Sequence, residues 1–177
     1  VNTEHSHASA EAAVSLARSG EVDTLMKGSL HTDEIMAAVL STQGGLRTER
    51  RVSHVFVMDV PAYDRILFVT DAAINIEPSL KEKADIAQNA IDLARSLGIE
   101  TPKVAILSAV EMVNPDINST IDAAALCKMA DRGQIRGAVL DGPLAFDNAI
   151  SEIAARTKSI HSPVAGRADI LLVPNIE

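Results

Sequence analysis

Apolar strand-like segments alternate with helix-like segments along most of this chain, and that order limits the possible folds more than any single motif. Short apolar runs at 103–107, 137–140 and 168–173 are separated by stretches with helical spacing. Such alternation predicts a sheet of parallel strands with helices on its faces. Only 2% of the residues are aromatic and none is Trp, so the core must be built from Ala, Val, Leu and Ile. We therefore expect an α/β fold.

The first fifty residues predict a helix, a strand and a second helix. The first helix is expected at 8–19, because Ala, Val and Leu recur at helical spacing and Gly20 provides a stop. A strand is expected at 22–26. The loop Lys27-Gly28-Ser29 follows it, and a second helix runs from Thr32 to about Leu40.

The middle of the chain predicts a hairpin and a long helix. Apolar strands at 54–60 and 65–69 are separated by only four residues, which is hairpin spacing. A long helix that ends at Gly98 follows. Its apolar face consists of Leu80, Ala84, Ala87, Ile91 and Ala94.

The remaining residues repeat the order of strand and helix. The strand at 103–107 is followed by a helix that ends near Asp131, and the strand at 137–140 by a helix from Leu144 to about Arg156. An α/β unit normally places another helix after its last strand. Because the sequence stops soon after the strand at 168–173, we expect it to stop in mid-fold.

The net charge limits the kind of partner that the chain can bind, and its cysteine content indicates the compartment. The net charge of −8 argues against nucleic acid, which is bound by clustered Lys and Arg. Cys127 is the single cysteine, so no disulfide can form within the chain, and a reducing cytoplasm is expected. No apolar run approaches the ~20 residues that span a bilayer, and residues 1–7 lack the pattern of a signal peptide. We therefore expect a cytoplasmic protein that binds no membrane.

A loop ahead of the second helix has the composition of an anion site. A helix N-terminus presents unpaired N–H groups, and Lys27 and His31 would add donors beside Gly28 and Thr32. This combination favours phosphate, although the glycine spacing is not that of a nucleotide P-loop. The alternative is structural: Gly28 serves a tight turn, Thr32 caps the helix and Lys27 is solvated.

Three arginines lie within residues 47–54. Guanidinium groups form paired hydrogen bonds to phosphate oxygens, so this segment is a second candidate for anion binding. Arg51, Ser53 and His54 are the best candidates because they lie nearest the predicted strand. A solvated basic loop is the alternative interpretation.

Polar residues follow two of the predicted strands. Asp71 and Asn75 follow the strand at 65–69, and Asp141 and Asp147 follow the strand at 137–140. Open α/β sheets bind ligands at this end of their strands, so these residues are expected to shape a pocket. Asp71 and Asn75 could equally satisfy loop amides as Asx turns.

The remaining reactive side chains show no pattern typical of a site. His5, His7 and His161 have no spacing to a carboxylate that suggests a metal site, and we expect none. Cys127 lies in an Ala-rich predicted helix, which favours a buried small hydrophobe over a nucleophile.

Several segments of the chain form a recognisable series: 25–28 with 31–32, 45–48 with 51–55, 67–75, 123–126, 141–145, and 162–166 through 173–177. Taken together and in this order, they resemble the phosphate acetyltransferase and phosphate butyryltransferase family. Residues 69–73 and 114–115 resemble the butyryl-type branch more closely than the acetyl-type branch. Some family members carry a fused hydratase domain.

The resemblance implies a doubly wound α/β architecture like that of isocitrate and isopropylmalate dehydrogenases, of which this chain would be the incomplete central part. It implies the reaction acyl-CoA plus phosphate to acyl phosphate plus CoA, with CoA as a substrate, no cofactor, and a homodimer. The division expected is a partial first domain and crossover at 1–60, a second domain at 61–160, and a return toward the first domain at 161–177. The implied substrate-binding residues are Lys27, Gly28, His31, Thr32, Arg51, Ser53, Asp71, Asn75, Asp141 and Asn175.

The family's catalytic segment would lie beyond Glu177, so the isolated 177-residue chain is expected to be inactive. Two alternatives remain open from the sequence. One is a non-catalytic module that binds acyl-CoA or acyl phosphate. The other is a metal- and NAD-dependent decarboxylating dehydrogenase of the same fold, for which the sequence shows neither a carboxylate cluster nor a nicotinamide site.

Overall fold

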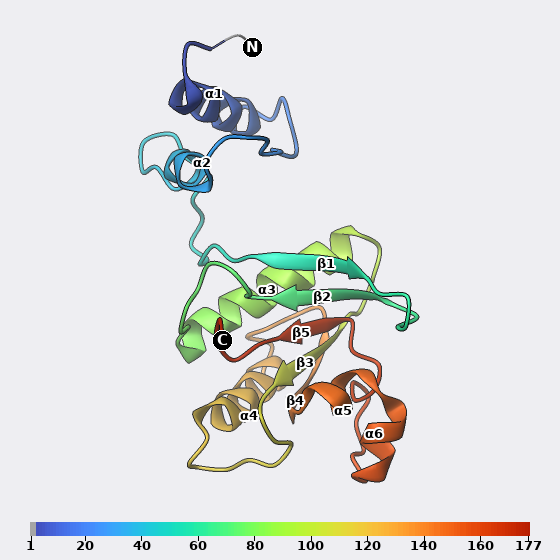
Figure 1. Ribbon diagram of the computed structural model, residues 1–177. Coiled ribbons are helices and arrows are strands. Elements are labelled where there is room, and N and C mark those ends of the chain that lie inside the picture. Colours follow the sequence, from blue (N-terminus) through green and yellow to red (C-terminus); the bar gives the residue numbers. More distant parts are fainter. Residues whose placement is uncertain (1–2) are drawn as a thin grey trace. The chain divides into compact units, whose positions relative to one another are not determined.

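The computed structural model describes residues 3–177, which divide into two compact units (Figure 1). The first unit ends at Arg50, and the second is Arg51–Glu177. No helix within residues 3–177 is both long enough and apolar enough to cross a membrane.

The first unit consists of two packed helices and their loops. Helix α1 is Ser6–Arg18, and helix α2 is Thr32–Val39. His5 caps α1, because its Nδ1 accepts a hydrogen bond from the backbone N of Ala8 at 3.2 Å. The strand predicted at 22–26 is wrong. Residues 3–50 contain no other strand with which it could pair, so the segment is irregular.

The second unit is built on a mixed five-stranded sheet in the order β1-β2-β5-β3-β4. Strands β2, β5, β3 and β4 are parallel, and β1 is antiparallel to β2. The predicted hairpin is confirmed by the pairing of β1 with β2. The strands are β1 Val55–Asp59, β2 Ile66–Thr70, β3 Lys103–Leu107, β4 Val139–Leu144 and β5 Ile170–Leu172.

Helices cover both faces of this sheet. Helices α3 and α4 pack on one face with Phe68, Val104 and Ile170, and the short helices α5 and α6 pack on the other with Leu67 and Leu171. The side chains of Ile170 and Leu171, which are adjacent in sequence, point to opposite faces of the sheet, as expected in a strand. The helices are α3 Leu80–Ser96, α4 Asn118–Asp131, α5 Phe146–Ile150 and α6 Glu152–Thr157.

The helix predicted from Leu144 to Arg156 is wrong in two respects. Strand β4 continues through Pro143 to Leu144, so the helical region starts later than predicted. It is then interrupted at Ser151, which has extended backbone angles (φ −123°, ψ 113°). The Ser151 side chain accepts a hydrogen bond from Ala154 N at 3.2 Å and so caps the second piece.

The expected isocitrate/isopropylmalate dehydrogenase-like architecture is also wrong. The sheet is mixed rather than fully parallel, because the hairpin adds an antiparallel strand at one edge. The α/β class itself is observed in the second unit. The division of a longer protein at residues 60 and 160 stays a prediction.

Candidate functional site

The four parallel strands end at the same edge of the sheet. The arrowheads of β2, β5 and β3 mark this edge in Figure 1. Asp71 follows β2, Ser108 follows β3, and Val173 follows β5. The backbone N of Val173 donates to Thr70 O at 2.8 Å, so the ends of β2 and β5 are adjacent. Open α/β sheets bind ligands outside this carboxyl edge.

Asp71 organises the loop that leaves β2. Its Oδ1 accepts hydrogen bonds from the backbone N of Ala73 and of Ile74, both at 3.0 Å. Its Oδ2 accepts from the backbone N of Asn75 at 3.2 Å and from the Asn75 side-chain amide. Burial alone would raise the pKa of Asp71, but these hydrogen bonds outweigh it, so the pKa lies below its usual value. Asp71 is therefore an ionised anchor of the loop.

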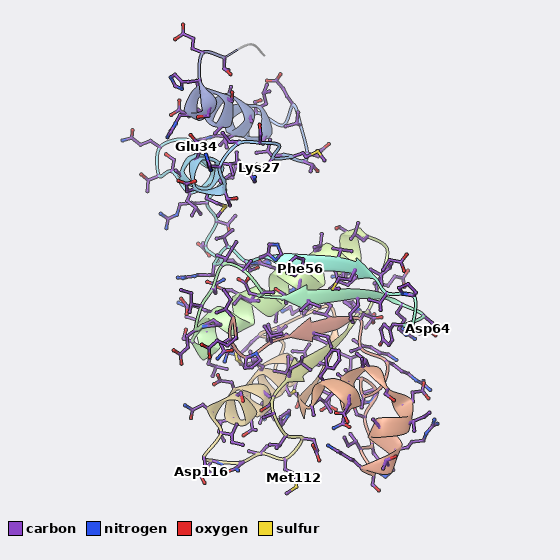
Figure 2. The ribbon with its side chains drawn as sticks, in the orientation of Figure 1. Lys27, Glu34, Phe56, Asp64, Met112 and Asp116 are labelled. Carbon is purple, nitrogen blue, oxygen red and sulfur yellow. The ribbon has the colours of Figure 1, made fainter. Side chains whose placement is uncertain are left out.

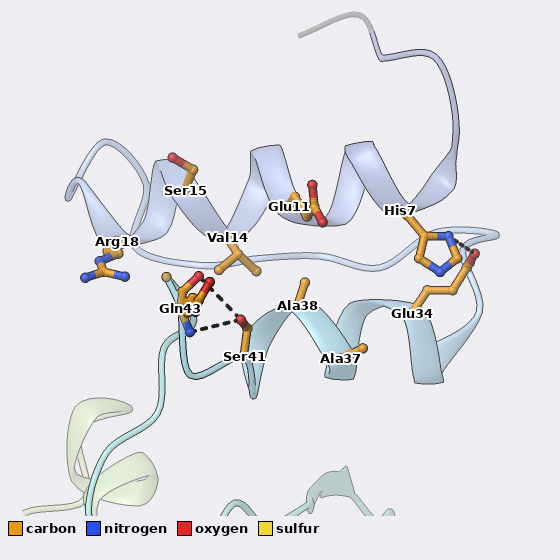
Figure 3. Close-up of a pocket in the computed structure, with 11 residues that line it drawn as sticks. His7, Glu11, Val14, Ser15, Arg18, Glu34, Ala37, Ala38, Ser41 and Gln43 are labelled. Atoms are coloured by element: carbon orange, nitrogen blue, oxygen red, sulfur yellow. Dashed lines mark hydrogen bonds and ion pairs between the residues drawn. The ribbon is translucent and has the colours of Figure 1, made fainter.

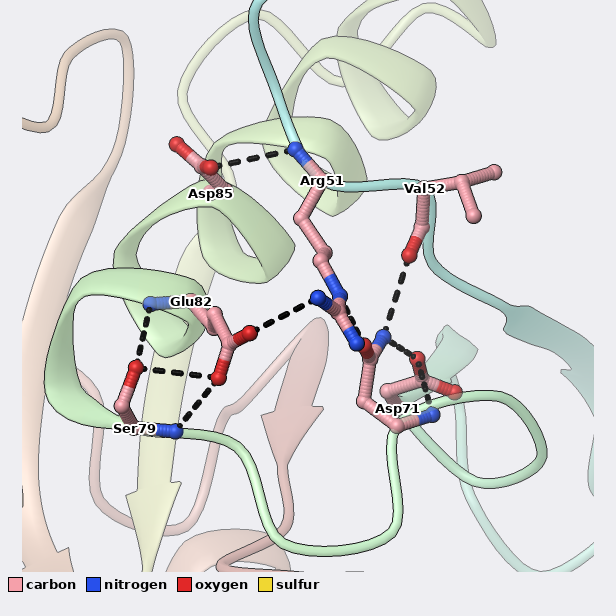
Figure 4. A network of polar contacts seen from close by, with 7 residues as sticks. Arg51, Val52, Asp71, Ser79, Glu82 and Asp85 are labelled. Carbon is pink, nitrogen blue, oxygen red and sulfur yellow. Dashed lines mark hydrogen bonds and ion pairs between the residues drawn. The ribbon is translucent and has the colours of Figure 1, made fainter. Parts of the chain in front are cut away.

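Asn75 connects this loop to Arg51; Figure 4 labels Arg51 and Asp71, the residues at the two ends of this connection. The Asn75 Oδ1 accepts a hydrogen bond from Arg51 Nε at 2.6 Å, and its Nδ2 donates to Val52 O at 3.0 Å. Only 3% of Asn75 is exposed, so its amide is fixed. The loop after β2 thus positions the first residues of the second unit.

Helix α3 supplies the other contacts to Arg51. Arg51 Nη1 lies 2.9 Å from Glu82 Oε1, and the Arg51 backbone N donates to Asp85 Oδ2 at 3.1 Å. Glu82 also completes a capping box, because the backbone N and the hydroxyl of Ser79 both donate to Glu82 Oε2 at 2.9 Å. The side chain of Arg51 remains 51% exposed. Its guanidinium is therefore oriented from two sides and still accessible to an anion.

Ser53 and His54 lie beside this cluster. The Ser53 hydroxyl accepts a hydrogen bond from Asn89 Nδ2 at 2.9 Å. The His54 ring packs edge-on against Phe56, with centroids 4.4 Å apart. The buried Nδ1 of His54 has no hydrogen-bond partner among residues 3–177. Ser53 is therefore tied to α3, and His54 keeps an unused polar atom.

Asn175 and Asp141, the other two predicted residues of the second unit, lie at different places relative to their strands. Asn175 follows β5, and its Oδ1 accepts from the backbone N of Glu177 at 3.1 Å. The neighbouring Ile176 donates its backbone N to Ile76 O at 3.0 Å, which brings this segment to the loop after β2. Asp141 lies within β4 rather than after it, because the strand continues to Leu144. The sequence therefore placed Asp141 incorrectly at a strand end.

The four predicted residues of the first unit surround the start of α2. Lys27 Nζ donates to the backbone oxygens of Gly28 and Leu30, at 3.2 and 2.8 Å. His31 is the N-cap of α2, and Thr32 is its first residue. The backbone N of His31 donates to Glu34 Oε2 at 3.2 Å. The Lys27 ammonium thus contacts its own loop, and a phosphate ligand at this place stays a prediction.

A groove of about 610 Å³ lies between α1 and α2 (Figure 3). At one end, His7 Nδ1 lies 3.1 Å from Glu34 Oε1, which also accepts a hydrogen bond from the Ser6 hydroxyl at 2.5 Å. The hydrogen bond from Ser6 is the main reason why the pKa of Glu34 is lowered. Arg18 lies at the other end of the groove. These contacts join the two helices.

The cysteine thiol and the side chains that could bind a metal are the remaining reactive groups. Burial, with the carboxylates of Asp141 and Asp131, raises the pKa of the Cys127 thiol to about 12. The thiol is therefore protonated at neutral pH, as expected for a small hydrophobe rather than a nucleophile. Within residues 3–177, no three His, Cys, Asp or Glu side chains are grouped so that they could hold a metal ion.

Sequence reasoning missed the contribution of α3. Glu82, Asp85 and Asn89 all contact residues 51–53. The spacing Ser79-x-x-Glu82 is a capping-box pattern and would have located the start of α3. The contact of Glu82 with a residue 31 positions earlier had no such signal.

The chain matches one protein-family model, described as phosphate acetyl/butaryl transferase, over residues 2–177. A phosphate acetyltransferase of Rhizobium meliloti is 64% identical over all of this chain and 56% of its own length. A phosphate butyryltransferase of Clostridium acetobutylicum is 52% identical over 93% of this chain and 55% of its own length. The chain therefore spans about half the length of these curated relatives.

A solved structure shares the fold of nearly the whole chain. A branched-chain phosphotransacylase from Enterococcus faecalis V583 superposes with a TM-score of 0.89 and 35% identity, over 99% of this chain and 63% of its own. This likeness is to a phosphotransacylase, and together with the mixed sheet it overturns the expected dehydrogenase-like architecture.

Proposed function

The chain belongs to the phosphate acetyl/butaryl transferase family, and on that premise we propose that the complete protein exchanges CoA and phosphate on a short acyl group. The reaction is acyl-CoA plus phosphate to acyl phosphate plus CoA. The observation that carries the proposal is the family match along residues 2–177. The acyl group is acetyl or butyryl, in keeping with the names of the two relatives.

The Arg51 cluster supports an anionic substrate. Asn75 and Glu82 hold the guanidinium from two sides, and half of its surface remains exposed. Guanidinium groups bind phosphate through paired N–H donors, and a fixed orientation lowers the entropy lost on binding. Arg51 would therefore bind the phosphate of the acyl phosphate, with Ser53 beside it.

The other predicted residues would have supporting roles. Asp71 and Asn75 position Arg51, and Asn175 lies on the adjacent segment after β5. Lys27, Gly28, His31 and Thr32 belong to the first unit and would offer a second set of donors to an anion. In the forward direction phosphate attacks the thioester carbonyl, and the CoA thiolate leaves. Donors that stabilise the developing oxyanion lower this barrier.

The proposal includes a homodimer, CoA as a substrate rather than a cofactor, and a cytoplasmic location. Strand β1 supports the dimer, because it is an edge strand on which Phe56, Val57 and Met58 are exposed. Figure 2 labels Phe56 on this strand. Exposed apolar edge strands offer unpaired backbone groups to another chain. A second copy would cover them.

CoA release in the presence of phosphate tests the reaction. The complete gene product and the 177-residue chain are each supplied with acetyl-CoA and butyryl-CoA, with and without phosphate. We expect phosphate-dependent release from the complete protein and none from the 177-residue chain. Binding of acyl-CoA without release by the complete protein would instead support a non-catalytic binding module. Robust release by the 177-residue chain would show that residues outside it are not required.

A further inference from the structure

Three isoleucines are exposed at the carboxyl edge of the sheet. Ile74 and Ile76 lie in the loop after β2, and Ile176 lies after β5. The backbone N of Ile176 donates to Ile76 O at 3.0 Å, so the two segments are joined where these side chains emerge. Ile76 is 72% exposed and Ile176 is 41% exposed. Together they form an aliphatic surface at the end of the strands where ligands bind.

The loop that carries Ile74 and Ile76 also contacts the Arg51 guanidinium. Asn75, between Ile74 and Ile76 in sequence, accepts the hydrogen bond from Arg51 Nε. The loop itself is fixed, because the buried carboxylate of Asp71 accepts the backbone N–H groups of residues 73–75. The same loop therefore holds a cationic group and carries apolar side chains.

We propose that Ile76 and Ile176 form the wall against which the acyl chain packs, and that Ile76 thereby sets the preference for acyl length. The inference rests on the proposed function. An acyl phosphate has an anionic head and an aliphatic tail, and this edge offers Arg51 to the head and the isoleucines to the tail. Each methylene that packs on an apolar wall increases the preference for the longer acyl chain, whereas an acetyl group is too short to reach the wall.

The test compares two acyl-CoA substrates in the complete gene product carrying Ile76→Ala. We expect the ratio of kcat/KM for butyryl-CoA to that for acetyl-CoA to fall about tenfold, the low end of the effect of one methylene in an apolar pocket. Ile76→Val, which keeps the branch, should give a smaller change in the same direction. Ile153→Ala is the matched control, because Ile153 on α6 is also 72% exposed. It should leave the ratio unchanged.

Two results would overturn the inference. One is a ratio that stays within twofold of the wild-type value in Ile76→Ala. The other is an equal loss with both substrates together with a lower melting temperature, which would mean that Ile76 packs against another part of the protein. Wild-type protein that releases CoA from neither substrate would refute the proposed function itself. That outcome is distinguishable, because it appears before any variant is made.

Discussion

Replacing Asp71 with alanine should destabilise the second unit by about 4 kcal/mol. The carboxylate accepts four hydrogen bonds, two of which come from Asn75. Ala73 and Ile74 are exposed, so water can replace the lost acceptor for their N–H groups. Asn75 is buried, so its backbone N–H and side-chain amide both lose an acceptor without access to water. Each buried donor left unsatisfied costs about 1–3 kcal/mol, and about 2 for each of the two gives the estimate.

Urea unfolding of the 177-residue chain measures this change. Tyr63 is the only tyrosine and donates its hydroxyl to Ala168 O, so tyrosine fluorescence reports on the second unit alone. The free energy of unfolding is extrapolated to water for the wild type and the variant. Asp116→Ala is the control, because it removes a carboxylate from an exposed residue. A loss below 1 kcal/mol in Asp71→Ala would refute the role assigned to Asp71.

Three further predictions concern pH, an ion pair and assembly. Because the folded pKa of Asp71 is lowered, its contribution to stability is present above its ordinary pKa of about 4 and is lost as pH falls through the folded value. The stability of Asp71→Ala, followed by circular dichroism during acid titration, should therefore depend less on pH than that of the wild type. Asp122→Ala leaves the buried ammonium of Lys83 without its partner at 2.6 Å and should cost about 3 kcal/mol in urea unfolding, whereas a neutral effect would mean that Lys83 finds another partner. Val57→Lys places a charge on the exposed edge strand and should convert the complete protein to a monomer in light scattering; an unchanged mass would place any dimer interface elsewhere.

Local elements were predictable where their pattern is periodic. The apolar face from Leu80 to Ala94 gave α3 correctly, because those positions face the sheet in the folded chain. The hairpin was predictable from the short spacing between two apolar runs. The strand at 22–26 failed because apolar residues indicate a strand only where a partner strand exists. Ser151 broke a predicted helix because it caps the next helix, a preference that helical periodicity does not capture.

The arrangement of the site depended on contacts between distant residues. Arg51, Asp71 and Asn75 were each predicted, but the link from Arg51 through Asn75 to Asp71 follows from the folded loop. Because β5 lies between β2 and β3, the segment after β5 reaches the loop after β2, and Ile176 N donates to Ile76 O. The order of the strands along the chain does not reveal this position of β5. Sequence motifs therefore predicted candidate residues, and the tertiary structure shows which of these residues contact one another.

The phosphate dependence of an Arg51 variant tests the central claim most directly. In the complete gene product, Arg51→Ala should raise the KM for phosphate at least tenfold, because a charge-assisted contact contributes about 1.5–3 kcal/mol. The KM for acyl-CoA should change less. Arg51→Lys should recover only part of the loss, because a lysine cannot contact Asn75 and Glu82 with a planar fork. An unchanged KM for phosphate in a folded Arg51→Ala protein would contradict the account.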